Sequence, residues 1–365
     1  MRSYLVDIMA MKQDFSSTPT SNIMSLMQEK NYEHINYFYD KDSGAKAIIA
    51  IHSTTLGPAL GGLRFYPYKD ESSALNDVLR LSKAMSYKAA IAGLSLGGGK
   101  SVLIGNPETD KNEAVLKSFG RFVERLNGKY ITSVDSGTSD EDMIAVKSET
   151  NHVTGAPPAF GGSGDPSPMT AYGVYRGILA SVAFQFGSSD LTGKRIAIQG
   201  LGHVGYPLAK LLHEAGAKLI VTDINEKRIE RCKQEFNAQA TTLDDILTVE
   251  CDVLAPCALG GIITEEIVPQ LNTPIVAGAA NNQLESPAIS ELLFEKNIVY
   301  APDFVINAGG LINVDQERHG YDETAAKAKT HQIHDTVLTI LNRSKQENQD
   351  TAKIAITMAK ERIYG

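Results

Sequence analysis

The chain has 365 residues and a formal net charge of −8, a length that suggests two or three domains. Its acidic balance argues against general binding to nucleic acid or to an anionic membrane. Its three cysteines include no Cys-x-x-Cys pair, which argues against a disulfide framework and a Cys-rich metal site. We therefore expect a reducing, cytoplasmic environment and no bound metal.

We expect neither a membrane span in the chain nor a targeting signal at its start. No apolar run reaches the roughly 18 residues that a membrane span needs. Residues 1–17 contain a short apolar patch interrupted by Asp7, without a small-residue cleavage site, so we interpret them as neither signal peptide nor anchor. The polar residues 12–21 predict a disordered lead-in.

The first half of the chain alternates between strand and helix patterns. Apolar periodicity predicts strands and helices in this order: strand 46–53, helix 71–92, strand 101–104, helix 112–126, strand 130–134, and a helix from 140 to about 150 capped by Ser139. The glycine-rich residues 57–64 are interpreted as a break after the first strand. These patterns predict an α/β domain.

The stretch Ser86–Lys100 stands out because two lysines, Lys88 and Lys100, flank an apolar run that ends in Gly97–Gly99. Glycines allow a backbone to approach a ligand closely. A lysine among apolar residues and beside a second cation has a lowered pKa, which suits acid–base chemistry. The alternative is a tight turn between helix and strand with two solvated lysines.

A glycine- and proline-rich segment, residues 151–168, is the best candidate for a domain boundary. A predicted helix over 169–186 follows it. A strand over 194–199 then runs directly into a glycine-rich turn and a helix over 204–215. The next strand, 218–222, ends in Asp223.

This second unit matches a dinucleotide-binding fingerprint in its structural context. The turn reads Gly200-Leu-Gly202-His203-Val204-Gly205. Its glycines would let a pyrophosphate sit at the helix N-terminus, and Asp223 would accept hydrogen bonds from the adenine ribose. Because Ile224 and Asn225 offer no arginine for a 2′-phosphate, we expect NAD rather than NADP. The alternative is a doubly wound sheet without a cofactor.

Further strands are predicted over 253–255, 275–277 and 298–301, each followed by small or polar residues. The carboxyl ends of parallel strands bind ligands in doubly wound sheets. Cys257 and Ala258 follow the first of these strands. Asn281 and Asn282 follow the second and would face the nicotinamide, although they could also be ordinary loop asparagines. Two helices, about 324–346 and 351–363, close the chain.

These motifs together resemble the amino-acid dehydrogenases that include the leucine, phenylalanine, valine and glutamate enzymes. The resemblance runs from about Asn31 to the end. The chain is similar above all to the leucine dehydrogenase branch, which includes phenylalanine- and tryptophan-type enzymes. It is carried by GPALGGLRF at 57–65, SYKAA at 86–90, GLSLGGGK at 93–100, YITSVDSGT at 130–138, GDPSPMTAYGV at 164–174, APCALGG at 255–261, AGAANNQL at 277–284 and APDFVINAGGLINV at 301–314.

The resemblance implies roles for individual residues. Lys88 would hold the substrate carboxylate, Lys100 would activate the attacking water, and Asp135 would shuttle protons to and from the amino group. Asn282 would lie near the substrate amine. The other implied substrate contacts are Leu60, Gly61, Met85, Ser133, Leu311 and Val314. The implied cofactor contacts, besides the glycine-rich turn and Asp223, are Thr170, Cys257, Ala258, Asn281 and Asn307.

The resemblance also implies the architecture and the partners. Residues 1–155, with a C-terminal part of about 335–365, would form a substrate-binding and oligomerisation domain. Residues 156–334 would form a Rossmann domain across a cleft. The expected reaction is NAD-dependent deamination of an apolar L-amino acid to a 2-oxo acid and ammonium, by a homo-oligomer of two to eight subunits. We expect neither nucleic acid nor membrane as a partner.

Two features depart from the family pattern. Val134 precedes Asp135 where leucine dehydrogenases usually carry glutamate, which leaves the choice among apolar substrates open. Residues 1–20 have no counterpart. Two other functions remain: a catalytically silent dinucleotide-binding protein, which the retained Lys88, Lys100 and Asp135 argue against, and a reductase for another carbonyl compound, which the paired lysines disfavour.

Overall fold

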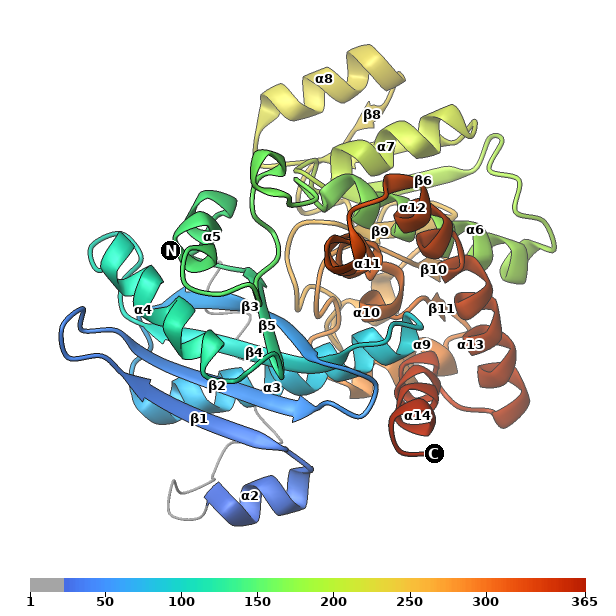
Figure 1. The fold of residues 1–365 in the computed structure, drawn as a ribbon. Coiled ribbons are helices and arrows are strands. Elements are labelled where there is room, and N and C mark those ends of the chain that lie inside the picture. The colour runs from blue at the N-terminus through green and yellow to red at the C-terminus, as the bar shows by residue number, and fades with distance from the viewer. Residues whose placement is uncertain (1–22) are drawn as a thin grey trace. The chain divides into compact units, whose positions relative to one another are not determined.

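The computed structural model describes residues 23–365, so the predicted lead-in over 12–21 lies outside the described residues (Figure 1). Contacts between Cα atoms divide the chain into two units. Of the described residues, the N-terminal unit contains 23–165, 314–322 and 359–365, and the C-terminal unit contains 166–313 and 323–358. The division falls within the glycine- and proline-rich segment 151–168.

The N-terminal unit is built on a mixed five-stranded sheet in the order β1-β2-β4-β3-β5. The pairs β1–β2 and β2–β4 are antiparallel, whereas β3 pairs in parallel with both β4 and β5. The strands are β1 (His34–Tyr39), β2 (Lys46–Ser53), β3 (Ala59–Tyr66), β4 (Gly97–Ile104) and β5 (Tyr130–Val134).

Helices cover both faces of this sheet (Figure 1). They are α2 (Ile23–Lys30), α3 (Glu71–Ile91), α4 (Glu113–Glu124) and α5 (Asp140–Lys147), with a short 3₁₀ turn, η2 (Pro158–Phe160), further along the chain. The face under α3 buries Ile48, Ala50 and Val102, whereas Ile49, Ile51 and Leu63 face α4 and α5. The sheet is thus apolar on both faces, as its near-continuous hydrophobic strands predict.

Side-chain caps begin three of these helices, and the predicted Ser139 cap is confirmed. Asp70 and Asn112 accept hydrogen bonds from the first turns of α3 and α4. Ser139 and Asp142 form a reciprocal capping box at the start of α5, which satisfies two backbone donors that the helix cannot.

The prediction of a break over 57–64 is wrong, because this segment forms β3, the strand between β4 and β5. Its glycines are packing residues. A Cβ on Gly61 would lie 1.8 Å from the Gly99 carbonyl oxygen, and one on Gly62 would lie 2.8 Å from the Asp135 Cβ. The glycine content that suggested a turn is therefore what allows close packing at this strand.

The three glycines before Lys100 lie inside β4, so the strand predicted over 101–104 begins earlier, at Gly97, and the alternative of a tight turn between helix and strand is wrong. A Cβ on Gly98 would lie 2.0 Å from the Ser86 backbone nitrogen of α3. A Cβ on Gly99 would lie 2.7 Å from the ring of Tyr130. These glycines bring α3 and β5 unusually close to β4, and thereby position the strand that carries Lys100.

The C-terminal unit contains a parallel six-stranded sheet in the order β11-β10-β9-β6-β7-β8. The strands are β6 (Arg195–Gln199), β7 (Lys218–Thr222), β8 (Gln239–Ala240), β9 (Val253–Pro256), β10 (Ile275–Val276) and β11 (Val299–Tyr300). The chain moves outward from β6 to β8 and then returns to the other side of β6. This is the doubly wound order, with its switch point between β6 and β9, and it confirms the predicted α/β fold.

The helices of this unit include α6, the long helix after the domain boundary, and α7, which follows the glycine-rich turn. The bounds of these helices are α6 (Ser167–Phe186), α7 (Gly205–Glu214), α8 (Glu226–Phe236), α9 (Ala288–Glu295), α10 (Asp303–Ile306), α11 (Gly309–Gln316), α12 (Glu323–His331), α13 (Ile333–Glu347) and α14 (Thr351–Tyr364), with a 3₁₀ turn, η3 (Val268–Gln270). The last residues of α11 and α14 lie with the N-terminal unit, as does the 3₁₀ turn η4 (Glu317–His319).

The end of the chain differs from its prediction in two ways. The helix expected over 324–346 is divided into α12 and α13 at Gln332. Because α13 packs along α6 and Thr351 donates to the Tyr300 carbonyl oxygen, residues 323–358 lie with the C-terminal unit. Only the last seven residues, 359–365, lie with the N-terminal unit, where Arg362 donates to the carbonyl oxygens of Ala90 and Leu94.

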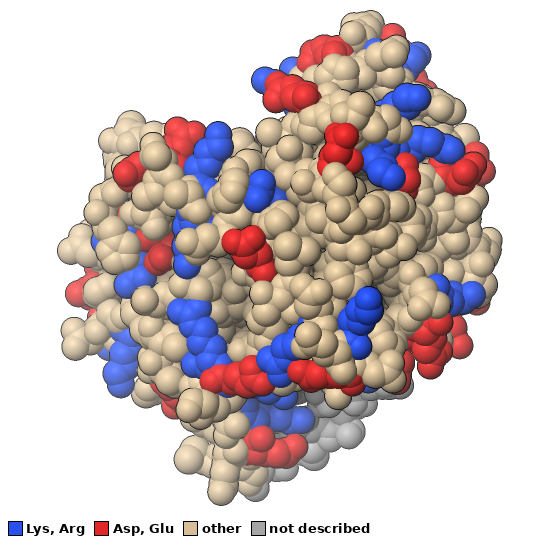
Figure 2. All heavy atoms as spheres, turned by 90° about the vertical axis from the view of Figure 1, so that its right-hand side faces the viewer, with Lys and Arg blue, Asp and Glu red and all other residues tan. Residues whose placement is uncertain are grey.

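We searched the surface for charged patches and the described residues for membrane-spanning helices and metal-ligand clusters. On the face drawn in Figure 2, acidic and basic side chains are interspersed rather than collected in one patch of one sign. Among residues 23–365, none of the helices combines the length and apolarity required to cross a bilayer. Nor do the same residues contain a His, Cys, Asp or Glu cluster suited to hold a metal ion.

We expect Gly98→Ala to destabilise the N-terminal unit by about 3 kcal/mol, because its Cβ would overlap the backbone of α3. Gly44→Ala is the control: Gly44 lies in the same unit at φ +74° with nothing within 4 Å of an added Cβ. That strain alone should cost about 1 kcal/mol. Urea unfolding of both variants measures the difference, and equal losses would contradict the packing role of Gly98.

Candidate active site

The register of the N-terminal sheet brings several predicted site residues to one face. Leu60 pairs with Gly98 and Ile131, and Gly62 pairs with Ser133. Since side chains alternate along a strand, Leu60, Lys100 and Ser133 share the face on which Gly98 meets α3. Leu60 and Ser133 are buried, and the Lys100 side chain is only 7% exposed.

Lys88 and Met85 come from the C-terminal part of α3, the helix that packs across this face. Both are half-buried. The helix thus contributes a second lysine to the side of the sheet from which Lys100 projects. The charged partner that the structure gives Lys100 is a carboxylate, which the lysine pattern did not indicate.

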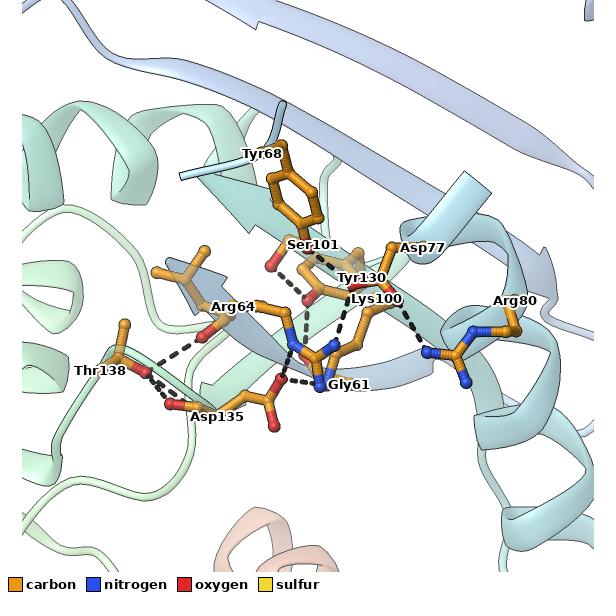
Figure 3. Close-up of polar contacts among 11 residues, drawn as sticks. Gly61, Arg64, Tyr68, Asp77, Arg80, Lys100, Ser101, Tyr130, Asp135 and Thr138 are labelled. Carbon is orange, nitrogen blue, oxygen red and sulfur yellow. Dashed lines mark hydrogen bonds and ion pairs between the residues drawn. The ribbon is translucent and has the colours of Figure 1, made fainter. Parts of the chain in front are cut away.

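That carboxylate belongs to Asp135, which follows β5 directly. Its Oδ2 atom lies 2.8 Å from Lys100 Nζ, and its side chain remains 24% exposed (Figure 3). Burial by itself would raise the pKa of Asp135, but the Lys100 ammonium and the Arg64 guanidinium more than reverse this and lower the pKa to about 2. Lys100 and Asp135 therefore form a mostly buried ion pair that can still be reached by a small molecule.

Sequence reasoning missed the residues that surround this pair. The Arg64 guanidinium lies between two carboxylates: Nε donates to Asp135 Oδ2 at 3.1 Å, and Nη1 donates to Asp77 Oδ2 at 2.9 Å. Tyr68 and Arg80 also donate to Asp77 (Figure 3). Arg64 lies two and four residues beyond Gly62 and Leu60 on β3, so strand alternation could have indicated that it shares their face.

The loop beside Ser133 is held by another residue that the sequence did not indicate. Glu317, just after α11, accepts hydrogen bonds from the backbone nitrogens of Gly155 and Ser163 and from the Ser163 hydroxyl. A Cβ on Gly155 would lie 2.8 Å from Ser133 Oγ. The segment 314–322, which begins with the buried Val314, is thus tied to the loop that covers Ser133.

Leu311 and Val314 lie three residues apart on α11, and both are buried. Residues at this spacing share one helix face. The division between units passes between them, so Val314 lies with Leu60 in the N-terminal unit and Leu311 lies in the C-terminal unit.

In the glycine-rich turn of the C-terminal unit, local geometry requires glycine at two of the three positions. Gly200 has φ +94°, which favours glycine, and a Cβ on it would lie 2.6 Å from the Ala258 Cβ. A Cβ on Gly205 would lie 1.9 Å from the Gly200 carbonyl oxygen. Gly202 differs, since only Arg228 lies within 4.0 Å of an added Cβ. Two glycines thus serve the turn and its packing, and the middle one leaves open space.

Asp223 stands at the end of β7, as predicted, but it is more enclosed than the sequence suggested. Its side chain is 5% exposed. One carboxylate oxygen accepts from the Leu201 backbone nitrogen at 2.7 Å and the other from Asn225 at 2.8 Å. The structure also adds Arg228, whose Nη1 lies 3.6 Å from Asp223 Oδ2. An arginine is therefore present at this end of the sheet, although the residues next to Asp223 contain none.

The loops after the other strands supply polar groups near the same edge. Asn307 donates its amide to the Ala279 carbonyl oxygen and to the Asn281 side chain at 2.7 Å. Asn282 has the left-handed φ +53°. Thr170, at the start of α6, lies against Gly310, where an added Cβ would be 2.6 Å from its hydroxyl.

Cys257 and His203 complete the predicted cofactor set. Cys257 follows β9 directly, and burial raises the pKa of its thiol to about 12. His203 and Val204 lie in the turn between β6 and α7, with His203 exposed. The predicted site residues thus form two groups, one on the mixed sheet of the N-terminal unit and one at the carboxyl edge of the parallel sheet.

Comparison with known families identifies the class of protein. Residues 31–152 match the model described as Glu/Leu/Phe/Val dehydrogenase, dimerisation domain, and residues 161–225 and 219–365 match Glutamate/Leucine/Phenylalanine/Valine dehydrogenase. The chain belongs to this family, as its motifs suggested, and is an amino-acid dehydrogenase. Enzymes of the family use a nicotinamide dinucleotide.

Individual relatives narrow the class to one branch. The chain is 52% identical to a leucine dehydrogenase of Geobacillus stearothermophilus over 341 residues, 93% of each chain. It is 45% identical to a phenylalanine dehydrogenase of Lysinibacillus sphaericus, covering 97% of this chain and 94% of the relative. The crystal structure of L-tryptophan dehydrogenase from Nostoc punctiforme matches with a TM-score of 0.85 and 43% identity, over 93% and 98% of the two chains. The protein therefore falls in the branch of amino-acid dehydrogenases for apolar amino acids.

Proposed function

We propose that this protein catalyses the reversible NAD⁺-dependent deamination of a branched-chain or aromatic L-amino acid. The balanced reaction is L-amino acid + NAD⁺ + H₂O → 2-oxo acid + NH₄⁺ + NADH + H⁺. The observation that carries the proposal is the Lys100–Asp135 ion pair, on the same sheet face as the apolar Leu60. The 52% identity to a leucine dehydrogenase supports the substrate class.

Within the N-terminal unit, each polar group has a distinct task in this proposal. Lys88, on α3, binds the substrate α-carboxylate and so orients the α-carbon. Asp135 accepts a proton from the substrate ammonium and returns one to the departing amine. Lys100 orients and activates the water that adds to the α-carbon, which is general acid–base work. Asn282, a residue of the C-terminal unit, is proposed to support the substrate amine.

The C-terminal unit fits the cofactor. Bound NAD⁺ supplies the acceptor for the hydride that leaves the substrate α-carbon. The open space at Gly202 suits a pyrophosphate at the N-terminus of α7. Asp223 has a second lone pair on each oxygen for ribose hydroxyls. Thr170, Asn281 and Asn307, with the Cys257–Ala258 turn, are the polar and small groups that would hold the nicotinamide.

The choice of an apolar substrate rests on Leu60 and Val314, with Gly61, Met85 and Ser133 as further proposed substrate contacts in the same unit. In glutamate dehydrogenases the resemblance places a lysine at the position of Leu60 and a serine at that of Val314. Both residues are apolar and buried here. A glutamate side chain would bury a carboxylate without a partner, which costs several kcal/mol, whereas an alkyl or aromatic group gains from burial.

Lys100→Ala should lower kcat by about 10²- to 10⁴-fold, because it removes the group that activates water. The Kd for NAD⁺ should stay unchanged, since Lys100 lies outside the dinucleotide-binding unit. Lys88→Ala should act mainly on KM for the amino acid. Initial rates followed by NADH absorbance and calorimetric NAD⁺ titration measure these quantities. Near wild-type kcat in Lys100→Ala would reject its assignment.

The wild-type protein should use NAD⁺ much better than NADP⁺, because the Asp223 carboxylate repels a 2′-phosphate. Asp223→Ser should raise kcat/KM for NADP⁺ by about tenfold or more, since Arg228 would then be available to bind the phosphate. The double variant Asp223→Ser with Arg228→Ala is the control and should lose this gain. Equal kcat/KM for NAD⁺ and NADP⁺ in the wild type would contradict the proposed cofactor choice.

Among leucine, phenylalanine, tryptophan and glutamate, glutamate should have the lowest kcat/KM in the wild type. Leu60→Lys should abolish activity on leucine, because it places a charge where the alkyl group would pack. A conservative Leu60→Met change should retain most activity, since volume and polarity are similar. If glutamate proved the best of the four substrates, the apolar pocket would be disproved.

A further inference from the structure

Arg64 is the residue of this site that neither the motifs nor the family resemblance assigned to a task. It lies on β3, between Asp77 of α3 and Asp135 after β5. Its side chain is 22% exposed and Asp77 is 16% exposed, so the guanidinium is largely withdrawn from water. A buried arginine at the junction of three elements has a structural task, a task in the site, or both.

The geometry around Asp135 favours a task in the site. Arg64 Nε and Lys100 Nζ both approach the same carboxylate oxygen, Oδ2, at 3.1 and 2.8 Å. The planar guanidinium cannot turn toward Asp135 independently, because Nη1 is bonded to Asp77. Asp77 in turn accepts from Tyr68 at 2.7 Å and from Arg80 at 2.8 Å. This row of contacts determines where Asp135 Oδ2 lies, and therefore where Lys100 points (Figure 3).

We propose that Arg64 is a positioning residue of the reaction: it holds the Asp135 carboxylate in place against the Lys100 ammonium, while Asp77 holds Arg64. This inference rests on the proposed function. Charge-assisted hydrogen bonds from a rigid fork orient a carboxylate more strictly than a single flexible ammonium does. Proton transfer requires such orientation, because small displacements of reacting groups are costly in rate.

The electrostatic surroundings of Asp135 agree with this geometry. The charged and titratable groups that act on it are Lys100, Arg64, Tyr68 and Tyr130. The two cations hold its pKa below that of an exposed aspartate against the effect of burial. Asp135 is therefore ionised throughout the neutral range. The contribution of ionised Asp135 to the free energy of unfolding is present above the ordinary aspartate pKa and is lost as pH falls toward 2.

The test compares Arg64→Gln, Arg64→Lys and the wild type in oxidative deamination. Arg64→Gln should lower kcat by about 10²-fold with KM for the amino acid and Kd for NAD⁺ nearly unchanged, because Arg64 orients the site without binding either ligand. Arg64→Lys keeps the positive charge but lacks the paired donors of the guanidinium, so its kcat should lie between those of Arg64→Gln and the wild type. If Arg64→Gln does not fold, the kcat of Arg64→Lys still tests the positioning role of Arg64.

Arg121→Gln is the matched control. Arg121 also lies between two carboxylates in the same unit, Glu149 at 3.5 Å and Asp40 at 4.0 Å, but on α4, away from the site. It should change thermal stability without changing kcat. Wild-type kcat in both Arg64 variants, or a loss confined to KM, would overturn the positioning role while leaving the proposed function intact. A wild-type protein without turnover on any apolar amino acid would instead reject the proposed function itself.

A second readout follows stability instead of turnover. In a double-mutant cycle of Arg64→Gln and Asp135→Asn, urea unfolding at neutral pH should show coupling between the two residues. The coupling should weaken as pH falls from about 4 toward 2, since protonated Asp135 no longer attracts the guanidinium. Coupling of zero at neutral pH would also overturn the proposal.

Discussion

The structure of the N-terminal unit depends on glycines at neighbouring positions of two paired strands, β3 and β4. Gly61 and Gly62 on β3, and Gly98 and Gly99 on β4, leave no room for a Cβ. Their neighbours at these points are backbone atoms, the Tyr130 ring and Asp135. Interiors are packed densely enough that a single added methyl group would have to displace one of these elements. The glycines thus set the spacing of α3, β3, β4 and β5.

That close spacing explains how charged residues can work in an apolar setting. Lys100 projects from β4 next to the glycines, and Asp135 sits against Gly62 at the end of β5. An isolated buried charge would be very unfavourable. Each charge here has an opposite charge within hydrogen-bond distance, and the row continues through Arg64 to Asp77. The candidate site is therefore a connected set of ion pairs that runs from Lys100 through Asp135 and Arg64 to Asp77.

The C-terminal unit uses glycine for a different purpose. Its turn needs one glycine for a positive φ and one for packing of the helix on the strand, and it keeps open space at the third. Asp223 serves two purposes, since its carboxylate caps the backbone of the turn and faces Arg228. In the proposed function, the Asp223 carboxylate and the Arg228 guanidinium together set the preference between NAD⁺ and NADP⁺.

Local sequence determined most of the elements and much of the chemistry. Periodicity predicted α3, α4 and α5 to within about three residues, and Ser139 marked the start of α5, because these signals are local in the chain. The strand, turn and helix over 194–215 follow one another directly in the chain, and this local order predicted the doubly wound sheet. Only the tertiary structure decided what the glycines do, since β3 and the start of β4 pair with strands far away in the chain. It also brought Arg64 to Asp135, 71 residues further on, because strand register brings together side chains whose separation along the chain carries no local signal.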